Sequence, residues 1–361
     1  MPRVCLKEID PIEEETMFKV KLAVAAAMFV AVGAFASNFR VADQVYVPAA
    51  GHIVGGSQLF ISDVFISNLT SDPVNVSVIF SAGPAGGAPQ TFNNVITLQP
   101  NERQEIPDFV GSKLGLQSNL GQLVFNGCKQ GGNCDVTTCP NGQTSGECAD
   151  FRNISVESRI YSVAANSANP TTAPSTGQLF SGIPWYNFVS SDSASVGLDR
   201  VFITGIRNST QYRTNIGLVN ASQFSTTTLV VKLYAGSNIN LNAPIATAQQ
   251  TLGPLGQAQP NVTALFPGVT VPATGAWVTV EQPAGSTPTA DAAANGCNNG
   301  CPAFFAYGSQ LDNNTGDATT LEAQYTKSLW DIGANHGAVA CIYNADCKAG
   351  LAIKIHRAVK H

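Results

Sequence analysis

The chain has 361 residues, with 19 Lys and Arg against 24 Asp and Glu, and a formal net charge of −5. Charged residues make up 12% of it and show no basic cluster, which argues against a nucleic-acid-binding protein. The length after removal of a leader suits two domains of ordinary size.

Residues 17–36 have the pattern of a secretory signal peptide. A short basic start at 17–21 precedes an apolar run at 22–35, and Ala34-Phe35-Ala36 is a small-x-small cleavage signal. Residues 1–16 are acidic and unlike the start of a signal, which predicts that Met17 is the true start. The alternative is an uncleaved segment that acts as a membrane anchor. We expect a soluble, secreted chain without a transmembrane segment after cleavage, at the cell surface, outside the cell or in the periplasm.

One nine-residue pattern occurs twice. Phe60-Ile61-Ser62-Asp63-Val64-Phe65-Ile66-Ser67-Asn68 is matched by Tyr212-Arg213-Thr214-Asn215-Ile216-Gly217-Leu218-Val219-Asn220, at an offset of 152 residues. That offset is far longer than a solenoid repeat, so the duplicated unit is a whole domain. The final Asn of each copy lies in Asx- and Ser-rich turn sequence, and Asp63 and Asn215 are either a paired polar site or side chains that bond the backbone.

Further strand patterns follow each copy in the same order. They are 74–80 and 228–234, 121–125 and 275–280, and 154–161 and 303–309. Short alternating strands separated by turn signals predict an all-β fold of two tandem β-sandwich domains, at 44–165 and 198–325. Residues 108–120 are compatible with one helical turn. We expect 166–197 to be an interdomain connector and 326–361 a C-terminal tail with a small disulfide loop.

The repeated strand resembles a family of tandem β-sandwich modules from uncharacterised secreted bacterial proteins. Those modules carry an aromatic-Arg-Thr-Asp/Asn strand that ends in Asn, as Tyr212 to Asn220 does, whereas Ile61 replaces the usual Arg in the first copy. The stretch 312–317 is also similar to that group. The resemblance covers most of residues 45–325 and implies immunoglobulin-like architecture and export. It implies no activity.

Eight cysteines remain after removal of the leader, and their even number in an exported chain predicts disulfides. They are Cys128, Cys134, Cys139, Cys148, Cys297, Cys301, Cys341 and Cys347. The first four lie in one polar loop and allow three pairings, and their spacing does not suit zinc. Such disulfide-stapled loops would either form a binding surface or protect the chain from proteolysis.

Two further segments are candidate ligand sites. Asp312, Asn314 and Asp317 place oxygen side chains in a pattern that resembles part of a calcium loop, although tight turns use the same residues. Trp185 and Tyr186 would form either an aromatic ligand platform or part of a core. Calcium is the only cofactor that the sequence suggests.

Catalytic motifs are absent from the sequence. It holds no Gly-x-Ser-x-Gly elbow and no His-Glu-x-x-His motif, and His52 is the only histidine near a predicted domain. We therefore predict an exported, non-catalytic binding or adhesion protein whose ligand is a protein or polysaccharide at the cell surface or in the matrix. One alternative is a self-associating subunit of an extracellular fibre or coat. Another is an accessory module or hydrolase, which would require His52 and two carboxylates to converge in one cleft.

Overall fold

The computed structural model describes eight stretches of the chain, all within the compact unit formed by residues 40–361. They are 41–84, 88–132, 150–184, 187–190, 200–222, 226–238, 240–282 and 303–325. The described part consists mainly of strands in several sheets, with little helix, which confirms the all-β prediction. The proposed signal peptide and the C-terminal tail lie outside the described residues. No helix among the described residues is long and apolar enough to cross a membrane.

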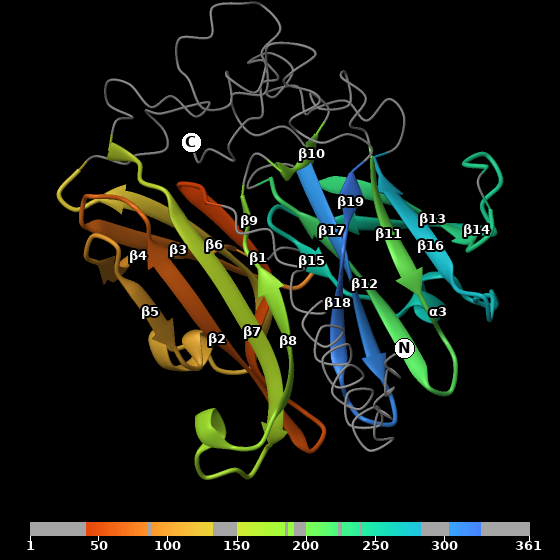
Figure 1. The fold of residues 1–361 in the computed structure, drawn as a ribbon, viewed down its shortest axis with the longest axis horizontal. Helices are drawn as coiled ribbons and strands as arrows, with labels where there is room; N and C mark the ends of the chain where they lie inside the picture. The colour runs from red at the N-terminus through yellow and green to blue at the C-terminus, as the bar shows by residue number, and fades with distance from the viewer. Residues whose placement is uncertain are drawn as a thin grey trace, which may run out of the picture. The chain divides into compact units, whose positions relative to one another are not determined.

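The first half consists of two layers of antiparallel strands joined at one end (Figure 1). One layer has the order β4 (Gln90–Leu98), β3 (Val74–Ala82), β6 (Asn119–Lys129), β1 (Gln44–Gly55). The other has the order β5 (Arg103–Ile106), β2 (Gln58–Asn68), β7 (Ile154–Ala164), β8 (Thr176–Ser181). The end of β1 also pairs with the start of β2, so the two layers share one continuous hydrogen-bonded sheet.

The second half repeats this order strand by strand. One sheet runs β14 (Ala246–Leu252), β13 (Thr227–Ala235), β16 (Ala276–Glu281), β11 (Arg200–Ile206), β19 (Gln324–Tyr325). The other runs β15 (Gln257–Ala258), β12 (Tyr212–Asn220), β17 (Ala303–Asp312), β18 (Ala318–Glu322), and β10 (Val189–Ser190) pairs with the start of β17. The repeated motif therefore forms β2 and β12, the corresponding strands of two similar sandwiches.

Short helices follow β5 and β15 at corresponding places, and another lies between β7 and β8. They are η2 (Phe109–Lys113), α3 (Val262–Leu265) and η5 (Pro170–Thr172). The first of these is the helical turn that the sequence allowed within 108–120.

The Asn that ends each motif is buried and ties a turn to the neighbouring loop. The Asn68 side-chain amide donates to the carbonyls of Asp72 and Gln99 at 2.7 and 3.0 Å. The Asn220 amide donates in the same way to the Gly253 carbonyl at 2.7 Å. Both residues are fully buried, so the repeated Asn is part of the fold, as the turn-forming interpretation predicted.

The range 166–197 is not simply a connector. Its strand β8 pairs with β7, and β9 (Ile183–Pro184) pairs with the start of β1. These two strands correspond to β18 and β19 of the second half, so the first sandwich continues to residue 184, beyond the predicted end at 165. The difference arises because 176–181 is short and has no β-branched residue after Thr176, so its pattern is weak.

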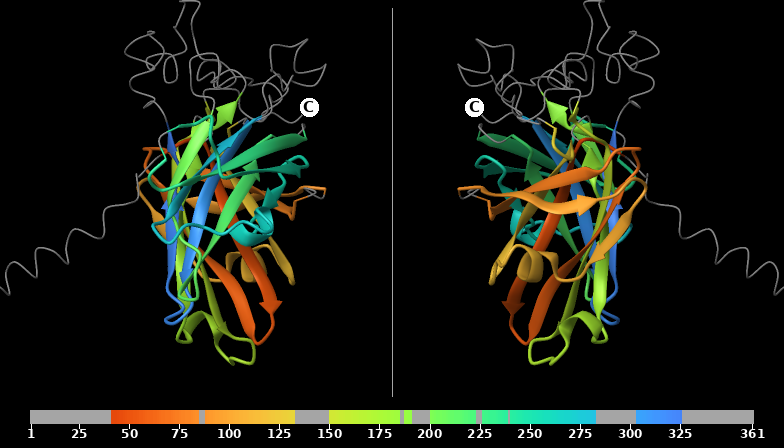
Figure 2. Two further views of the ribbon diagram at one scale, coloured as in Figure 1. Left: turned by 90° about the vertical axis from the view of Figure 1, so that its right-hand side faces the viewer. Right: turned by 90° about the vertical axis from the view of Figure 1, so that its left-hand side faces the viewer.

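The two sandwiches pack against each other through one hydrophobic cluster to which both contribute, and the second sandwich also has a core cluster of its own. In β17, Phe304 points into the second sandwich, whereas Phe305 faces the first and lies beside Tyr46 of β1 and Phe188. Hydrogen bonds reinforce the contact: the Tyr46 hydroxyl donates to the Ala221 carbonyl at 3.3 Å. Figure 2 shows the strands of both halves from either side. The sequence predicted two tandem domains but not this shared hydrophobic core.

Candidate functional site

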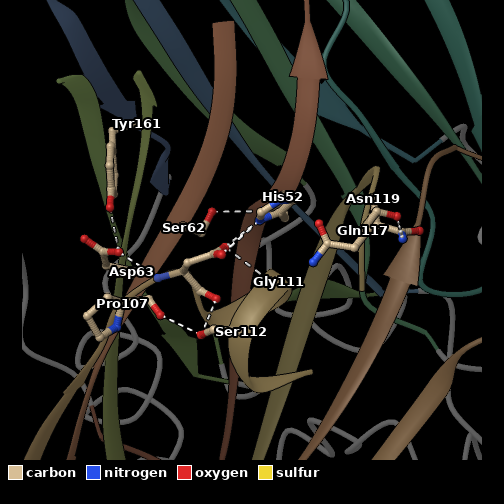
Figure 3. Close-up of polar contacts among 11 residues, drawn as sticks. His52, Ser62, Asp63, Pro107, Gly111, Ser112, Gln117, Asn119 and Tyr161 are labelled. Atoms are coloured by element: carbon tan, nitrogen blue, oxygen red, sulfur yellow. Dashed lines mark hydrogen bonds and ion pairs between the residues drawn. The ribbon is translucent and has the colours of Figure 1, made fainter. Parts of the chain in front are cut away.

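A buried polar cluster lies on the outer side of the first sandwich, around Asp63 of β2 (Figure 3). One oxygen of the Asp63 carboxylate, Oδ1, accepts hydrogen bonds from the Tyr161 hydroxyl of β7 and from the backbone N–H of Asp108, both at 3.0 Å. Asp63 and Tyr161 are 7% and 2% exposed. Because buried polar groups are costly unless they are paired, this arrangement fixes the loop after β5 against the sheet.

Asp108 extends the cluster to His52 on β1. The two Asp108 carboxylate oxygens lie 2.8 and 3.0 Å from the imidazole Nδ1 of His52. Asp108 also caps η2, since its Oδ1 accepts from the Gly111 N–H at 3.3 Å. A side chain at position 111 would lie 2.2 Å from His52 Nδ1, so this contact needs the glycine. The sequence of the turn is thus suited to holding a His–Asp pair.

His52 is the open end of the cluster. Its side chain is 17% exposed, and no hydrogen bond to its Nε2 is found among the described residues. Asn119 pairs with His52 in the β1–β6 register, and the Gln117 side chain points toward the same place (Figure 3). Asn119 is half-buried and Gln117 is exposed. We call His52, Gln117 and Asn119 the open face of the cluster.

Tyr161 is held in a neutral form by its surroundings. Burial raises the pKa of its phenol well above the usual range, and the Asp63 carboxylate adds to the shift. The Arg159 guanidinium, 4.5 Å from the Tyr161 ring centre, acts in the opposite direction. Because the folded-state pKa exceeds the unfolded one, Tyr161 contributes stability that is complete below about pH 10 and is lost as the pH rises through the folded value.

An alkaline titration tests this assignment. We expect the Tyr161→Phe variant to show the same phenolate absorbance as the wild type at about pH 11 when folded, because Tyr161 is not yet ionised there. In urea the variant should lose one of the eight tyrosine signals. A loss of absorbance at that pH in the folded variant would show that Tyr161 titrates normally.

The second sandwich lacks the ionisable members of this cluster. Asn215 takes the place of Asp63, and Asn261, the cap of α3, takes that of Asp108, with a bond from the Asn261 amide to Asn215 Oδ1 at 3.2 Å. The strand registers place Asn208 where the first half has His52, and Leu311 where it has Tyr161. The same scaffold therefore carries an acid–base network in one copy only.

The His–Asp pair is a general-base arrangement that lacks an obvious nucleophile. An Asp that accepts from Nδ1 orients an imidazole so that Nε2 can take a proton. Ser62 is the nearest hydroxyl on β2, but it is fully buried and accepts from the Gly51 N–H at 2.9 Å. Within the described ranges, no group of three or more His, Cys, Asp or Glu side chains could hold a metal ion.

The other predicted site residues are not brought to this cluster. Trp185 and Tyr186 lie outside the described residues, as do all of the predicted disulfide cysteines except Cys128 in β6, so disulfide pairing stays a prediction. The 312–317 stretch is the β17–β18 turn. Backbone N–H groups of Asn314 and Thr315 donate to Asp312 Oδ1 at 2.8 and 3.3 Å, and these bonds lower the pKa of that carboxyl. This geometry favours the turn interpretation, and calcium binding stays a prediction.

The sequence pointed to parts of the cluster but not to the whole. The sequence pairs Asp63 with Asn215 and places His52 near a predicted domain, but it does not connect Asp108 or Tyr161 with either. The separations along the chain explain this, because Asp63 is 45 residues from Asp108 and 98 from Tyr161. The feature of the sequence that indicates this site is the difference between Asp63 in the first copy of the motif and Asn215 in the second.

Comparison with known proteins identifies no family. No family model matches the chain, and no curated protein matches its sequence. A solved structure titled "Biofilm associated protein - BSP domain" aligns with 87% of this chain and 66% of its own length, at 10% identity and a TM-score of 0.20. A likeness at that TM-score supports no conclusion about fold or function.

Proposed function

We propose that the chain is an exported, non-catalytic binding protein of the cell surface or extracellular matrix. In this proposal two tandem immunoglobulin-like sandwiches with disulfide-stapled loops form a rigid body, the second sandwich serves as scaffold, and the first contacts the ligand. The proposal rests chiefly on one observation: the polar cluster with its open face occurs in the first sandwich alone.

The difference between the copies matters because both have the same local scaffold. A purely structural need at this place is met in the second sandwich by Asn215 and Asn261, without any ionisable group. The first sandwich instead holds two carboxylates, of which Asp63 is 7% and Asp108 9% exposed. Burial of charged groups costs free energy that their hydrogen bonds only partly offset. A function for the His52 imidazole, which Asp108 holds in place at the surface, would explain why the first sandwich keeps these two buried carboxylates.

The open face suits a neutral, hydroxyl-rich ligand, and we therefore propose a polysaccharide. Its groups are an imidazole and two side-chain amides, which both donate and accept hydrogen bonds. The surrounding turn adds Ser112, an exposed hydroxyl on η2. Two of these groups, His52 and Asn119, are on strands, and polar groups of this kind fix the orientation of a ligand without demanding that it carry charge.

A glycan array with the mature chain tests this proposal, with a pull-down of surface proteins as a second arm. We expect retention on polysaccharide spots, and a loss of affinity of about tenfold in His52→Ala, which removes one hydrogen-bonding group. The matched control is Asn208→Ala, at the corresponding place in the second sandwich, which should bind as the wild type does. Equal losses in both variants, capture of a surface protein without binding to any polysaccharide spot, or no binding at all would each contradict the proposal.

The His52–Asp108 pair also supports a second candidate, a hydrolase or accessory module that acts on an extracellular polymer. His52, Asp63 and Asp108 lie in one hydrogen-bonded cluster, which is one part of the arrangement that this alternative requires, the other part being a cleft. If the chain is such a hydrolase, it should release shorter fragments from a polysaccharide that it binds. This release should stop in Asp108→Asn, which cannot stabilise the protonated imidazole. If the length of the polymer is unchanged after incubation with the wild type, the hydrolase candidate is excluded and binding is the function that is left.

A further inference from the structure

The outer edge of β14 is unprotected, unlike the other sheet edges of the described part. An exposed edge strand presents unpaired N–H and C=O groups, and proteins normally block such edges with charges, prolines, bulges or covering segments. Strand β14 pairs regularly with β13 over seven residues, and it contains no charged residue and no proline. Thr247, Gln249 and Thr251 are exposed along it.

The corresponding edge of the first sandwich, β4, carries a bulge. Its register against β3 shifts between Val76 and Val78, and Asn94 adopts a left-handed conformation with φ of 49°. The Asn94 N–H is bonded to the Ser77 hydroxyl at 3.0 Å. A bulge of this kind twists an edge strand away from a straight partner. The first sandwich therefore has two features that the second lacks, the bulged edge strand and the ionisable polar cluster.

The remaining edges are short, charged or covered. Strand β5 has four residues, two of them charged, and β15 and β19 have two residues each. Strands β8 and β18 lie against each other between the sandwiches, where the Thr320 hydroxyl donates to the Leu179 carbonyl at 2.6 Å. Among the described strands, β14 is thus the long regular edge that stays open.

From this asymmetry we infer that β14 is the site of homodimerisation, where it pairs antiparallel with β14 of a second copy of this chain. The midpoint of the strand is Gln249, so pairing about it sets Thr247 opposite Thr251 and Gln249 opposite its own copy. Thr–Thr pairs are favourable across strands, and no like charges meet. A two-fold pairing of this kind closes on itself and produces a dimer, not a fibre.

The loop before β14 adds apolar surface to the same edge. Leu241 and Ile245 are 39% and 43% exposed, and they are two of the seven large apolar side chains that are exposed among the described residues. In the proposed register Ile245 lies opposite Gly253 of the second copy, whose N–H donates to the Pro84 carbonyl of its own chain at 3.0 Å. The dimer joins two five-stranded sheets into one continuous sheet.

Sedimentation velocity of the mature, full-length chain over a wide concentration range tests the inference. We expect a reversible dimer in the wild type. Gln249→Lys sets two like charges opposite each other at the two-fold axis and should raise the dimer Kd about tenfold or more. The matched control Thr91→Lys places the same charge on an exposed position of the bulged strand β4 and should change the Kd by less than about twofold.

Circular dichroism melting checks that both lysine variants are folded. A wild type that stays monomeric at the highest concentration would overturn the inference. So would a Gln249→Lys variant that dimerises as tightly as the wild type, or a Thr91→Lys variant that is monomeric. None of these results depends on polysaccharide binding, so the dimer and the proposed function are tested separately.

Discussion

Replacement of Phe305 by alanine is expected to destabilise both sandwiches together, by about 4 kcal/mol, in a single unfolding transition. The ring is 1% exposed and belongs to β17 of the second sandwich. It stacks on Phe188 with ring centres 5.5 Å apart and meets the Tyr46 ring of the first sandwich edge-on at 6.2 Å. Removal of an aromatic ring from such a core loses its transfer free energy and leaves a cavity between the halves.

Denaturant unfolding followed by both fluorescence and circular dichroism measures this effect. The control is Phe202→Ala, which removes a half-buried ring beside Trp277 on the outer face of the second sandwich. We expect the control to cost about half as much or less, because less surface leaves water there. Two separate transitions, with the one that belongs to the first sandwich unmoved by Phe305→Ala, would show that the halves are independent domains.

Asp63→Ala is the second substitution with a large expected effect, a loss of about 3 kcal/mol in the free energy of unfolding. The alanine leaves two buried donors without an acceptor, the Tyr161 hydroxyl and the Asp108 N–H. Each unsatisfied buried group costs about 1–3 kcal/mol. The variant should also expose His52 further, because Asp108 is then less firmly held.

Two further variants distinguish the contribution of the hydrogen bonds to stability from that of the charge. Asp63→Asn keeps a carbonyl oxygen in the position of Oδ1 and should recover more than half of the loss, as Asn215 does in the second sandwich. Asn215→Ala removes one side-chain bond at 3.2 Å and should cost about 1 kcal/mol. Equal losses in Asp63→Ala and Asn215→Ala would mean that the cluster adds nothing specific to the first copy.

The strands and their duplication could be predicted from the sequence because they follow from local patterns. Alternation of apolar and polar residues marks β3 and β13, and the repeated motif identifies β2 and β12. The fixed Asn at the end of each motif has a local role, since it bonds the turn that follows. Such features depend on neighbours along the chain and are therefore visible in it.

The shared core and the polar cluster depend on contacts between distant residues, which no local pattern encodes. Tyr46 and Phe305 lie in stretches of β1 and β17 where successive residues are all buried, so both faces of these strands are covered. The sequence does not indicate that the other sandwich covers one of those faces. The β8 strand has only six residues and no β-branched residue after Thr176, so its sequence does not distinguish it from a linker. Asp108 resembles any helix cap until the fold brings His52 to it.

Hydrogen exchange on the mature chain, with and without a saturating amount of the polysaccharide retained by the array, tests most directly whether the first sandwich carries the ligand site. We expect slower exchange at residues 50–53 and 111–120, which include the open face of His52, Gln117 and Asn119. Residues 206–209 and 264–275, at the corresponding places in the second sandwich, should exchange as in the free chain. Protection confined to the second sandwich, or absent from both at saturation, would show that the first sandwich does not carry the ligand site.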